Sequence, residues 1–392
     1  MVGVDPSLTA ALSLQLTPGV GPKTYGALVK AFGSAGAVWN ASSADWAEVP
    51  GVGRKLVEQL RLARDGRLAE KELAWCAANG VRVIADSHPA YPQSLSKIPD
   101  PPAICFSRGE LIPQDQLAIA VIGSRQCTLY GRQQTERLAA GLARAGITVV
   151  SGLARGIDSA AHRGALSANG RTIAVLGTGL NNVYPPENQG LAEEISRSGA
   201  VVTEMPHDQA ALPGLFPQRN RIISGLSLGV LVVEAHRKSG AMHTVRHALE
   251  QGRDVFALPG RVDSLASEGC HDLIRDGATL VRNIDDILGQ LGPLTQPVET
   301  RGTDASLGAT SPNGPAPSPA GVVQNARELT LNEIERAVLA RVAAEPKAVD
   351  LILSSCATGD SPLEPSRVLA TLTILEMKRF VQRLPGGQVA RW

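Results

Sequence analysis

The chain has 392 residues, of which 43% are hydrophobic and 3% aromatic, and its 38 basic residues almost balance its 37 acidic ones. This length and composition favour two or three packed domains, while the near-zero net charge gives no reason of its own to expect a polyanionic partner. The five cysteines form no C-x-x-C pair, which excludes a zinc ribbon and a disulfide scaffold and is typical of a reducing cytosol.

Two copies of one short motif open the chain, TPGVGPK at 17–23 and PGVGRK at 50–55. Each precedes a helix-compatible stretch, as in a helix-hairpin-helix arrangement. The glycines permit a tight turn, and N–H groups at the following helix start can hold a nucleic-acid phosphate. We therefore predict a helical domain over residues 1–80. An ordinary helical hairpin capped by glycine is the alternative, so contact with DNA stays open here.

Residues 81–291 alternate short apolar runs with helical stretches. The runs lie at 118–123, 147–152, 172–177, 200–204, 229–235, 254–260 and 278–283. Runs rich in β-branched residues, each followed by a loop and a helix, are typical of a parallel sheet covered on both faces. The predicted fold class is α/β, a Rossmann-like doubly wound parallel sheet, with the strand-like stretch 81–106 extending it.

The last hundred residues fall into two parts. Residues 292–327 are rich in Pro, Gly, Ser and Thr and poor in aliphatic side chains, which predicts a flexible linker. Residues 328–392 follow as a small unit, with helices expected at 331–344, 349–354 and 365–377 and a two-stranded tail. No apolar run approaches the about 18 residues of a membrane span, and the first residues lack a signal-peptide pattern. We expect a cytoplasmic protein with no membrane partner.

Three consecutive predicted strands end in glycine-rich loops, and ligands of such sheets bind at these carboxyl ends. Backbone N–H groups of small-residue loops bind anions, and arginine adds a bidentate clamp. Between residues 123 and 246 there are 13 Lys and Arg against 8 Asp and Glu, a local charge of 13 − 8 = +5. These observations predict a phosphate-binding edge at Gly123, Ser124, Arg125, Ser151, Gly152, Arg155, Gly156, Gly177 and Gly179.

The segment 216–227 adds one aromatic and several polar side chains, Phe216, Arg219, Asn220 and Arg221. Cations that follow phosphates beside a ring that stacks a base are typical of single-stranded nucleic-acid binding. A core position is the alternative for Phe216.

The chain lacks G-x-x-x-x-G-K-[ST], H-E-x-x-H, G-x-G-x-x-G after the first strand, and any His/Cys cluster. Their absence predicts no nucleotide hydrolysis, no metal and no cofactor. Asp158 and His162 have a spacing that could pair an acid with a base on one helix, but no activated nucleophile lies beside them in sequence. A chance pair on a helix surface is the favoured interpretation.

Five ordered motifs resemble those of the DNA-processing protein A family, DprA, also called Smf. They are GSR at 123–125, SGLARGID at 151–158, TIAVLGTGL…YPPEN at 172–188, FPQRNRIISGLS at 216–227 and SG…GRDVFALPG at 239–260. The resemblance implies a SAM-like helix-hairpin-helix domain in front and a winged-helix-like domain in residues 328–392. The stretch CATGDSPLEPS after the second helix of that tail departs from a compact winged helix, so a structural or protein-contact role competes with duplex-DNA binding there.

The resemblance implies that the protein binds single-stranded DNA, protects it during natural transformation and helps to load the RecA recombinase. It implies a homodimer through the Rossmann domain, around helix 244–251, where Met242, Val245 and Leu249 could form an apolar stripe. The DNA contacts that it carries over are Arg125, Arg171, Asn188, Phe216, Arg219 and Arg221.

Two other function classes compete with this interpretation. Phosphoribohydrolase-like Rossmann enzymes carry P-G-G-x-G-T-x-x-E, whose glutamate is catalytic. The corresponding segment here, Ser239 to His247, lacks the glycine pair and the glutamate, which predicts anion binding without bond cleavage and a protein that is not an enzyme. A pure scaffold, with binding confined to the terminal domains, is disfavoured by the local positive charge.

Overall fold

The computed structural model describes residues 5–291, 333–342, 347–357, 364–377, 380–384 and 388–391. The chain divides into two compact units, Met1–Leu291 and Gly292–Trp392. The predicted helical domain 1–80 and sheet domain 81–291 thus pack together as the first unit. The predicted linker at 292–327 lies outside the described residues.

A nine-stranded sheet in the order β1-β2-β6-β5-β4-β3-β7-β8-β9 forms the centre of the first unit. Its strands are β1 (Arg82–Ala85), β2 (Ile104–Gly109), β3 (Ala118–Ile122), β4 (Thr148–Ser151), β5 (Thr172–Val175), β6 (Ala200–Thr203), β7 (Gly229–Val232), β8 (Asp254–Ala257) and β9 (Thr279–Leu280). Strands β3 to β9 pair in parallel, and β1 and β2 join antiparallel at the β6 edge. All seven predicted runs form strands, and the predicted extension of the sheet is confirmed.

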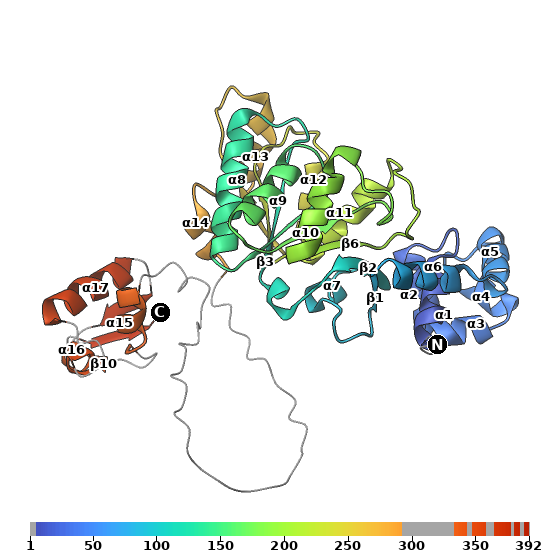
Figure 1. Ribbon diagram of the computed structural model, residues 1–392, viewed down its shortest axis with the longest axis horizontal. Helices are drawn as coiled ribbons and strands as arrows, with labels where there is room; N and C mark the ends of the chain where they lie inside the picture. The colour runs from blue at the N-terminus through green and yellow to red at the C-terminus, as the bar shows by residue number, and fades with distance from the viewer. Residues whose placement is uncertain are drawn as a thin grey trace, which may run out of the picture. The chain divides into compact units, whose positions relative to one another are not determined.

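Helices cover both faces of this sheet (Figure 1). They are α7 (Gln93–Ser96), α8 (Leu129–Arg144), α9 (Ile157–Ser167), α10 (Gln189–Ser198), α11 (Leu215–Gly225), α12 (Ala241–Glu250), α13 (Glu268–Arg275) and α14 (Ile284–Leu288). Side chains alternate along a strand. Ala118, Ala120 and Ile122 therefore pack against α7, α11, α12 and α13, whereas Ile119 and Val121 pack against α8, α9 and α14.

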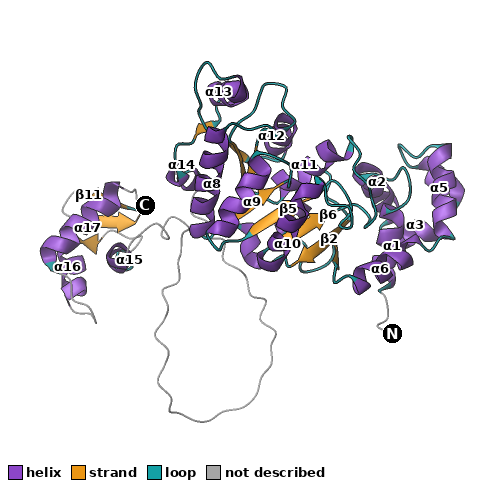
Figure 2. Ribbon diagram, turned by 45° about the horizontal axis from the view of Figure 1, so that its top comes forward, coloured by secondary structure: helices purple, strands orange, loops and turns teal. Residues whose placement is uncertain are grey.

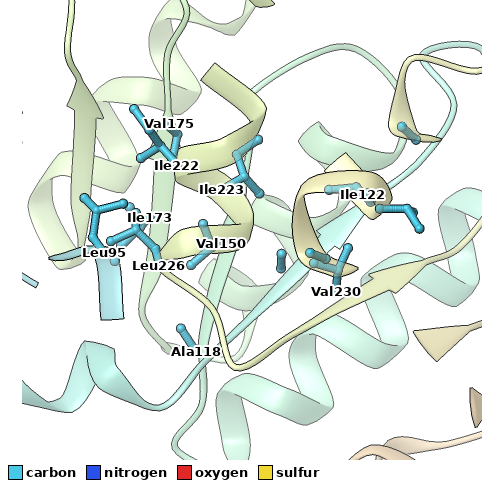
Figure 3. Close-up of a cluster of buried hydrophobic side chains, with 14 of the residues drawn as sticks. Leu95, Ala118, Ile122, Val150, Ile173, Val175, Ile222, Ile223, Leu226 and Val230 are labelled. Carbon is cyan, nitrogen blue, oxygen red and sulfur yellow. The ribbon is translucent and has the colours of Figure 1, made fainter. Parts of the chain in front are cut away.

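Helix α11 contributes Ile222 and Ile223 to the first of these cores. Both side chains are almost fully buried, and Figure 3 shows them against Val150, Ile173 and Val175 of the sheet. Burial of this apolar surface fixes α11 across the strands. The start of α11 therefore lies at the carboxyl ends of those strands.

The first 80 residues form six helices (Figure 2), α1 (Pro6–Gln15), α2 (Pro22–Phe32), α3 (Ala35–Asn40), α4 (Ser43–Glu48), α5 (Arg54–Arg64) and α6 (Leu68–Ala78). Gly19 and Gly51 have φ of 90° and 88°, the left-handed region that favours glycine. Each lies in the turn before α2 or α5, as the repeated motif predicts. The helical domain packs on the sheet: the Gln15 side chain donates to the carbonyls of Ile104 and Glu204.

The second unit contains α15 (Glu333–Leu339), β10 (Lys347–Ala348), α16 (Val349–Ala357), α17 (Pro365–Met377), β11 (Val381–Leu384) and β12 (Gln388–Arg391). The three strands pair in the order β10-β12-β11. The three predicted helices and the two-stranded tail are present. The sequence missed β10, because two residues give no alternating pattern. The six residues 358–363 of the long connection lie outside the described residues.

No helix among the described residues is both long and apolar enough to cross a membrane.

Candidate functional site

The sheet has a switch point between β3 and β7. From β3 the chain continues to β4, β5 and β6 on one side, and from β7 to β8 and β9 on the other. Ligands of doubly wound sheets bind where the strand order reverses in this way. A cavity of about 740 Å³ opens there, between the loops after β3, β4 and β7 and the start of α11. We call it the switch-point cavity.

Arg125 is an exposed cation of this cavity. It has no carboxylate within ion-pair distance among residues 5–291, and its guanidinium lies 5.6 Å from the centre of the Phe216 ring. That ring is half-buried and lies 5.6 Å from the ring of Tyr184, at an interplanar angle of 47°. One cation and two aromatic rings therefore share the edge of the cavity. The prediction for Phe216 gains support over the core alternative, and Tyr184 is a cavity residue that sequence reasoning missed.

The glycines of the first two loops allow those loops to touch. A Cβ at Gly123 would lie 2.6 Å from Ile157 Cγ1, and a Cβ at Gly156 would meet the Ser124 carbonyl. Gly156 also has φ of 74°. The contact is completed by the Ile157 N–H, which donates to the Ser124 carbonyl at 3.1 Å. These glycines are thus needed for close packing, which brings Arg125 and Arg155 to one edge.

Two N–H groups of the loop after β4 are bound by a carboxylate of the protein itself. Gly152 and Ala154 both donate to Asp158 Oδ2, at 3.1 and 3.3 Å. Burial raises the pKa of Asp158, and the nearby Arg219 charge opposes that shift. These two N–H groups are therefore not available to an anion, and Arg155 is the exposed cation of this loop. Arg155 itself forms an ion pair with Glu187.

Arg219 forms the floor of the cavity rather than an exposed clamp. Its side chain is buried and donates to the carbonyls of Gly152 and Val175, at the ends of β4 and β5. Burial lowers the pKa of Arg219 to about 10; the Asp158 carboxylate opposes this shift, and the Arg125 charge adds to it. The residue lines the cavity as predicted; both of these hydrogen bonds come from Nη1, and Nε is buried without a hydrogen-bond partner among the described residues.

The prediction that Arg221 belongs to the site is wrong. Its guanidinium makes a two-pronged ion pair with Glu204, at 2.8 and 2.7 Å, and donates to the Asp100 carbonyl at 3.0 Å. Only 3% of the side chain is exposed. Two residues beyond Arg219 on α11, it points to a different side of the helix and anchors it to β6.

The placement of Arg171 in the site is also wrong. The residue precedes β5, so it lies at the opposite edge of the sheet from the strand ends that form the cavity. Its guanidinium binds both carboxylate oxygens of Asp115 at 2.9 Å and donates to the carbonyls of Glu110 and Ser198. Arg171 joins three segments of the protein and has no free side to offer a ligand.

The remaining predicted residues divide by exposure. Ser124 and Asn220 line the switch-point cavity. Asn188 is buried and donates to the Leu153 carbonyl and Ser159 Oγ. Three residues are buried and line neither the switch-point cavity nor a second cavity beside it, namely Ser151, Gly177 and Gly179.

Further side chains reach the cavities, some from the segment 239–247, for which the sequence predicts anion binding, and others that no motif marks. The segment after β7 brings Ser239, His243 and Thr244 to the switch-point cavity. Arg132 on α8 and Arg163 on α9 line a second cavity beside it. Their helices are amphipathic in sequence, which predicts their exposure but not which cavity they reach. Among the described residues, no group of three or more His, Cys, Asp and Glu could hold a metal ion.

Asp158 and His162 do not form a catalytic pair. His162 Nδ1 lies 2.7 Å from Thr172 Oγ1, whose hydroxyl donates to the Val149 carbonyl. The Thr172 hydroxyl oxygen must therefore accept a hydrogen bond from Nδ1–H, which leaves Nε2 of the neutral ring unprotonated and without a partner among the described residues. Burial, helped by the charge of Arg219, lowers the pKa of His162 to about 3.

This buried histidine predicts a pH dependence of stability. The unfolded imidazole binds a proton near pH 6.5 and the folded one near pH 3, so unfolding takes up a proton between these values. From this group alone, the free energy of unfolding should fall by up to about 1.4 kcal/mol per pH unit as the pH drops through that window. Denaturant unfolding of the wild type and His162→Gln at pH 4.5 and 7 measures it. Equal losses in both proteins would refute the assignment.

Residues 82–292 match the family model of the DNA recombination-mediator protein A, which covers more than half of the chain. The chain belongs to the DNA recombination-mediator protein A family. Residues 12–64 match the SAM-like helix-hairpin-helix tandem and residues 324–387 the DprA winged helix domain. The predicted family and the three-part fold class are confirmed.

Relatives of this family align along much of the chain. Protein Smf of Synechocystis is 34% identical over 391 residues, covering 95% of this chain and 96% of its own. The crystal structure of DNA processing protein A from Streptococcus pneumoniae is 34% identical, with a TM-score of 0.63, over 72% of this chain and 97% of its own. A structure of the Helicobacter pylori protein, described for its single-stranded DNA binding mode, is 31% identical over 54% of this chain and 95% of its own, with a TM-score of 0.49.

Proposed function

We propose that the switch-point cavity binds single-stranded DNA without cleaving it. The observation that carries the proposal is the edge formed by Arg125, Phe216 and Tyr184, where an unpaired guanidinium adjoins two accessible rings. Aromatic faces stack unpaired bases and arginine follows the phosphates, which is the usual division of labour in single-strand binding. Bases of a duplex already stack on one another and cannot lie on these rings. The site therefore selects the single strand.

The same cavity offers little to an enzyme. The segment Ser239 to Thr244 contributes hydroxyl and imidazole groups to its lining, but no carboxylate. Asp158, the acid that does line it, is buried and occupied by two backbone N–H groups and the charge of Arg219. A phosphoribohydrolase-like reaction needs a carboxylate that is free to reach the substrate. Binding without turnover is the better account of this chemistry.

At the level of the cell, we infer that the protein protects incoming single-stranded DNA during natural transformation and helps to load RecA onto it in the cytoplasm. The family resemblance supports this role. It also supports a homodimer through the Rossmann domain. Of the stripe expected on α12, Val245 is buried and Met242 packs on the core, so Leu249, 63% exposed, is the member that a partner subunit could cover.

A parallel titration tests the function. Labelled single-stranded oligonucleotide, the matching duplex and free nucleotides are titrated into the full chain, with product analysis of each mixture. We expect tighter binding of the single strand than of the duplex, and no turnover. Release of base or sugar from a nucleotide would replace the proposal with the enzymatic alternative. RecA filament assembly on coated DNA, followed with and without the protein, tests the loading role.

Arg125→Ala should weaken binding of single-stranded DNA. The change removes one charge-assisted, bidentate phosphate contact, a loss of about 1.5–3 kcal/mol and thus roughly 10- to 150-fold in affinity. The slope of log K against log salt should fall in magnitude by about 0.7. Arg125→Lys should recover only part of the affinity, because an ammonium cannot form the two-pronged contact.

Arg171→Ala is the matched control for that experiment, since it removes the same charge from the opposite edge of the sheet. The change leaves the Asp115 carboxylate, which is 8% exposed, without its ion-pair partner. It should lower the free energy of unfolding by about 3 kcal/mol. Its folded fraction should bind DNA with the wild-type salt slope. An unchanged slope for Arg125→Ala, or an equal change in both variants, would contradict the phosphate contact.

A chain ending at Leu291 should keep most of the single-strand affinity and the dimeric state. The switch-point cavity and α12 both lie in the first compact unit. Oligonucleotide titration and sedimentation velocity of the shortened and full chains measure the two properties. Loss of binding would place the site in the second unit, and a monomeric shortened chain would move the dimer interface there.

A further inference from the structure

A second cavity lies beside the switch-point cavity. It encloses about 470 Å³ between the starts of α8 and α9 and the turn at 186–188. Four arginine side chains and two hydroxyl groups contribute to its lining, namely Arg125, Arg132, Arg155, Arg163, Thr128 and Ser159. No acidic and no aromatic side chain lines it. We call it the arginine cavity.

Three of the four arginines of this cavity lack an acidic partner, and the fourth, Arg155, forms an ion pair with Glu187. Neither Arg132 nor Arg163 has a carboxylate within ion-pair distance in the described part of the chain, and the same is true of Arg125. Elsewhere in the first unit, exposed arginines such as Arg237 and Arg282 do form such pairs. Like charges gathered around one space repel each other, and a bound anion relieves that repulsion.

The start of α8, one of the two helix starts at this cavity, is already capped. The hydroxyl of Thr128 accepts from the Gly131 N–H at 3.1 Å and donates to Glu234 Oε1 at 2.6 Å. The other Glu234 oxygen accepts from the Thr128 N–H at 2.8 Å. The positive end of α8 is thus partly neutralised by Glu234. An anion in the arginine cavity is therefore held by the guanidinium groups rather than by the start of α8.

The two cavities share a border. Arg125, Gln126 and Arg155 line both of them. On the switch-point side of Arg125 lie the rings that can stack bases; on the other side lie guanidinium, hydroxyl and amide groups with Cys127 and Leu129, and no aromatic ring. A ligand that crosses Arg125 therefore passes from a surface suited to bases to one suited to phosphates.

We propose that the arginine cavity is a second phosphate site, which holds the backbone of the same DNA strand beyond the nucleotides that stack in the switch-point cavity. The inference rests on the proposed function and deepens it. Arg132 and Arg163 bind the successive phosphates, each as a bidentate clamp. Because no aromatic ring lines the cavity, it contributes affinity for a longer strand without sequence preference.

The experiment compares oligonucleotides of increasing length on the full chain. The wild type should bind more tightly as the strand grows long enough to reach both cavities. Arg132→Gln/Arg163→Gln should bind the shortest oligonucleotides within about twofold of the wild type, yet lose roughly 10- to 100-fold for long ones, about one decade or less per lost clamp. Its salt slope on long strands should fall in magnitude by about 1.4, which is 0.7 for each phosphate contact.

The matched control is Arg144→Gln/Arg197→Gln. It removes the same charge from the last turns of α8 and α10, outside both cavities. Melting temperatures of all variants check folding; exposed arginines without partners should leave them unchanged. Equal loss in the control, or long strands bound by the cavity variant with wild-type affinity and slope, overturns the inference while leaving the proposed function in place.

Two further arms separate the sources of the phosphate. If the cavity variant loses affinity only for strands with a 5′-phosphate, the site holds a strand end, and the internal-backbone proposal fails. If millimolar inorganic phosphate abolishes the advantage of long strands for the wild type but not the binding of short ones, the phosphate site is supported. Failure of the wild type to bind any oligonucleotide removes the proposed function itself, a result distinct from all of these.

Discussion

The site depends on one buried cation, Arg219. Its guanidinium bonds the carbonyls that end β4 and β5 and faces Asp158, which in turn holds the N–H groups of the β4 loop. An unpaired charge at that depth would be strongly destabilising, so the arrangement persists only with all partners in place. It fixes the start of α11, where Phe216 lies three residues before Arg219 and on the same face. The bonds of the buried Arg219 thus hold the Phe216 ring at the edge of the switch-point cavity.

The arginines of the first unit divide accordingly into two kinds. Arg171 and Arg221 are consumed by acids and carbonyls and join segments of the fold. Arg125, Arg132 and Arg163 have no such partner in the described residues and lie at the two cavities. The division matters because a paired guanidinium gives up an existing bond when it takes a phosphate, whereas an unpaired one gives up only water. The local positive charge counted from the sequence therefore overstates the charge that is available to a ligand. The arginines that remain unpaired are concentrated at the two cavities.

The sequence was sufficient for the sheet and for the general position of the site. Seven strands have continuous apolar runs in the sequence, and glycines such as Gly123 and Gly156 mark loops that approach each other too closely for a side chain. The sequence could not show that Arg171 is engaged in an ion pair whereas Arg125 is not. The partner of Arg171 is Asp115, 56 residues away in sequence, and only the folded chain brings the two together. Tyr184 and Arg163 follow no period that a sequence reveals, because the cavities that they line, the switch-point cavity and the arginine cavity, are each made by separate loops and helices.

The unpaired arginines also bear on how the unliganded protein behaves. Arg125 contributes to the lowered pKa of Arg219, which means that the exposed edge and the buried floor repel each other across the cavity wall. Salt screens the exposed charges far more than the buried one. An anion at the edge relieves the same repulsion by direct contact, so it favours the folded arrangement that holds Arg219 in place. The buried Arg219 and the exposed arginines at the edge are thereby coupled. An anion bound at that edge stabilises the arrangement around Arg219.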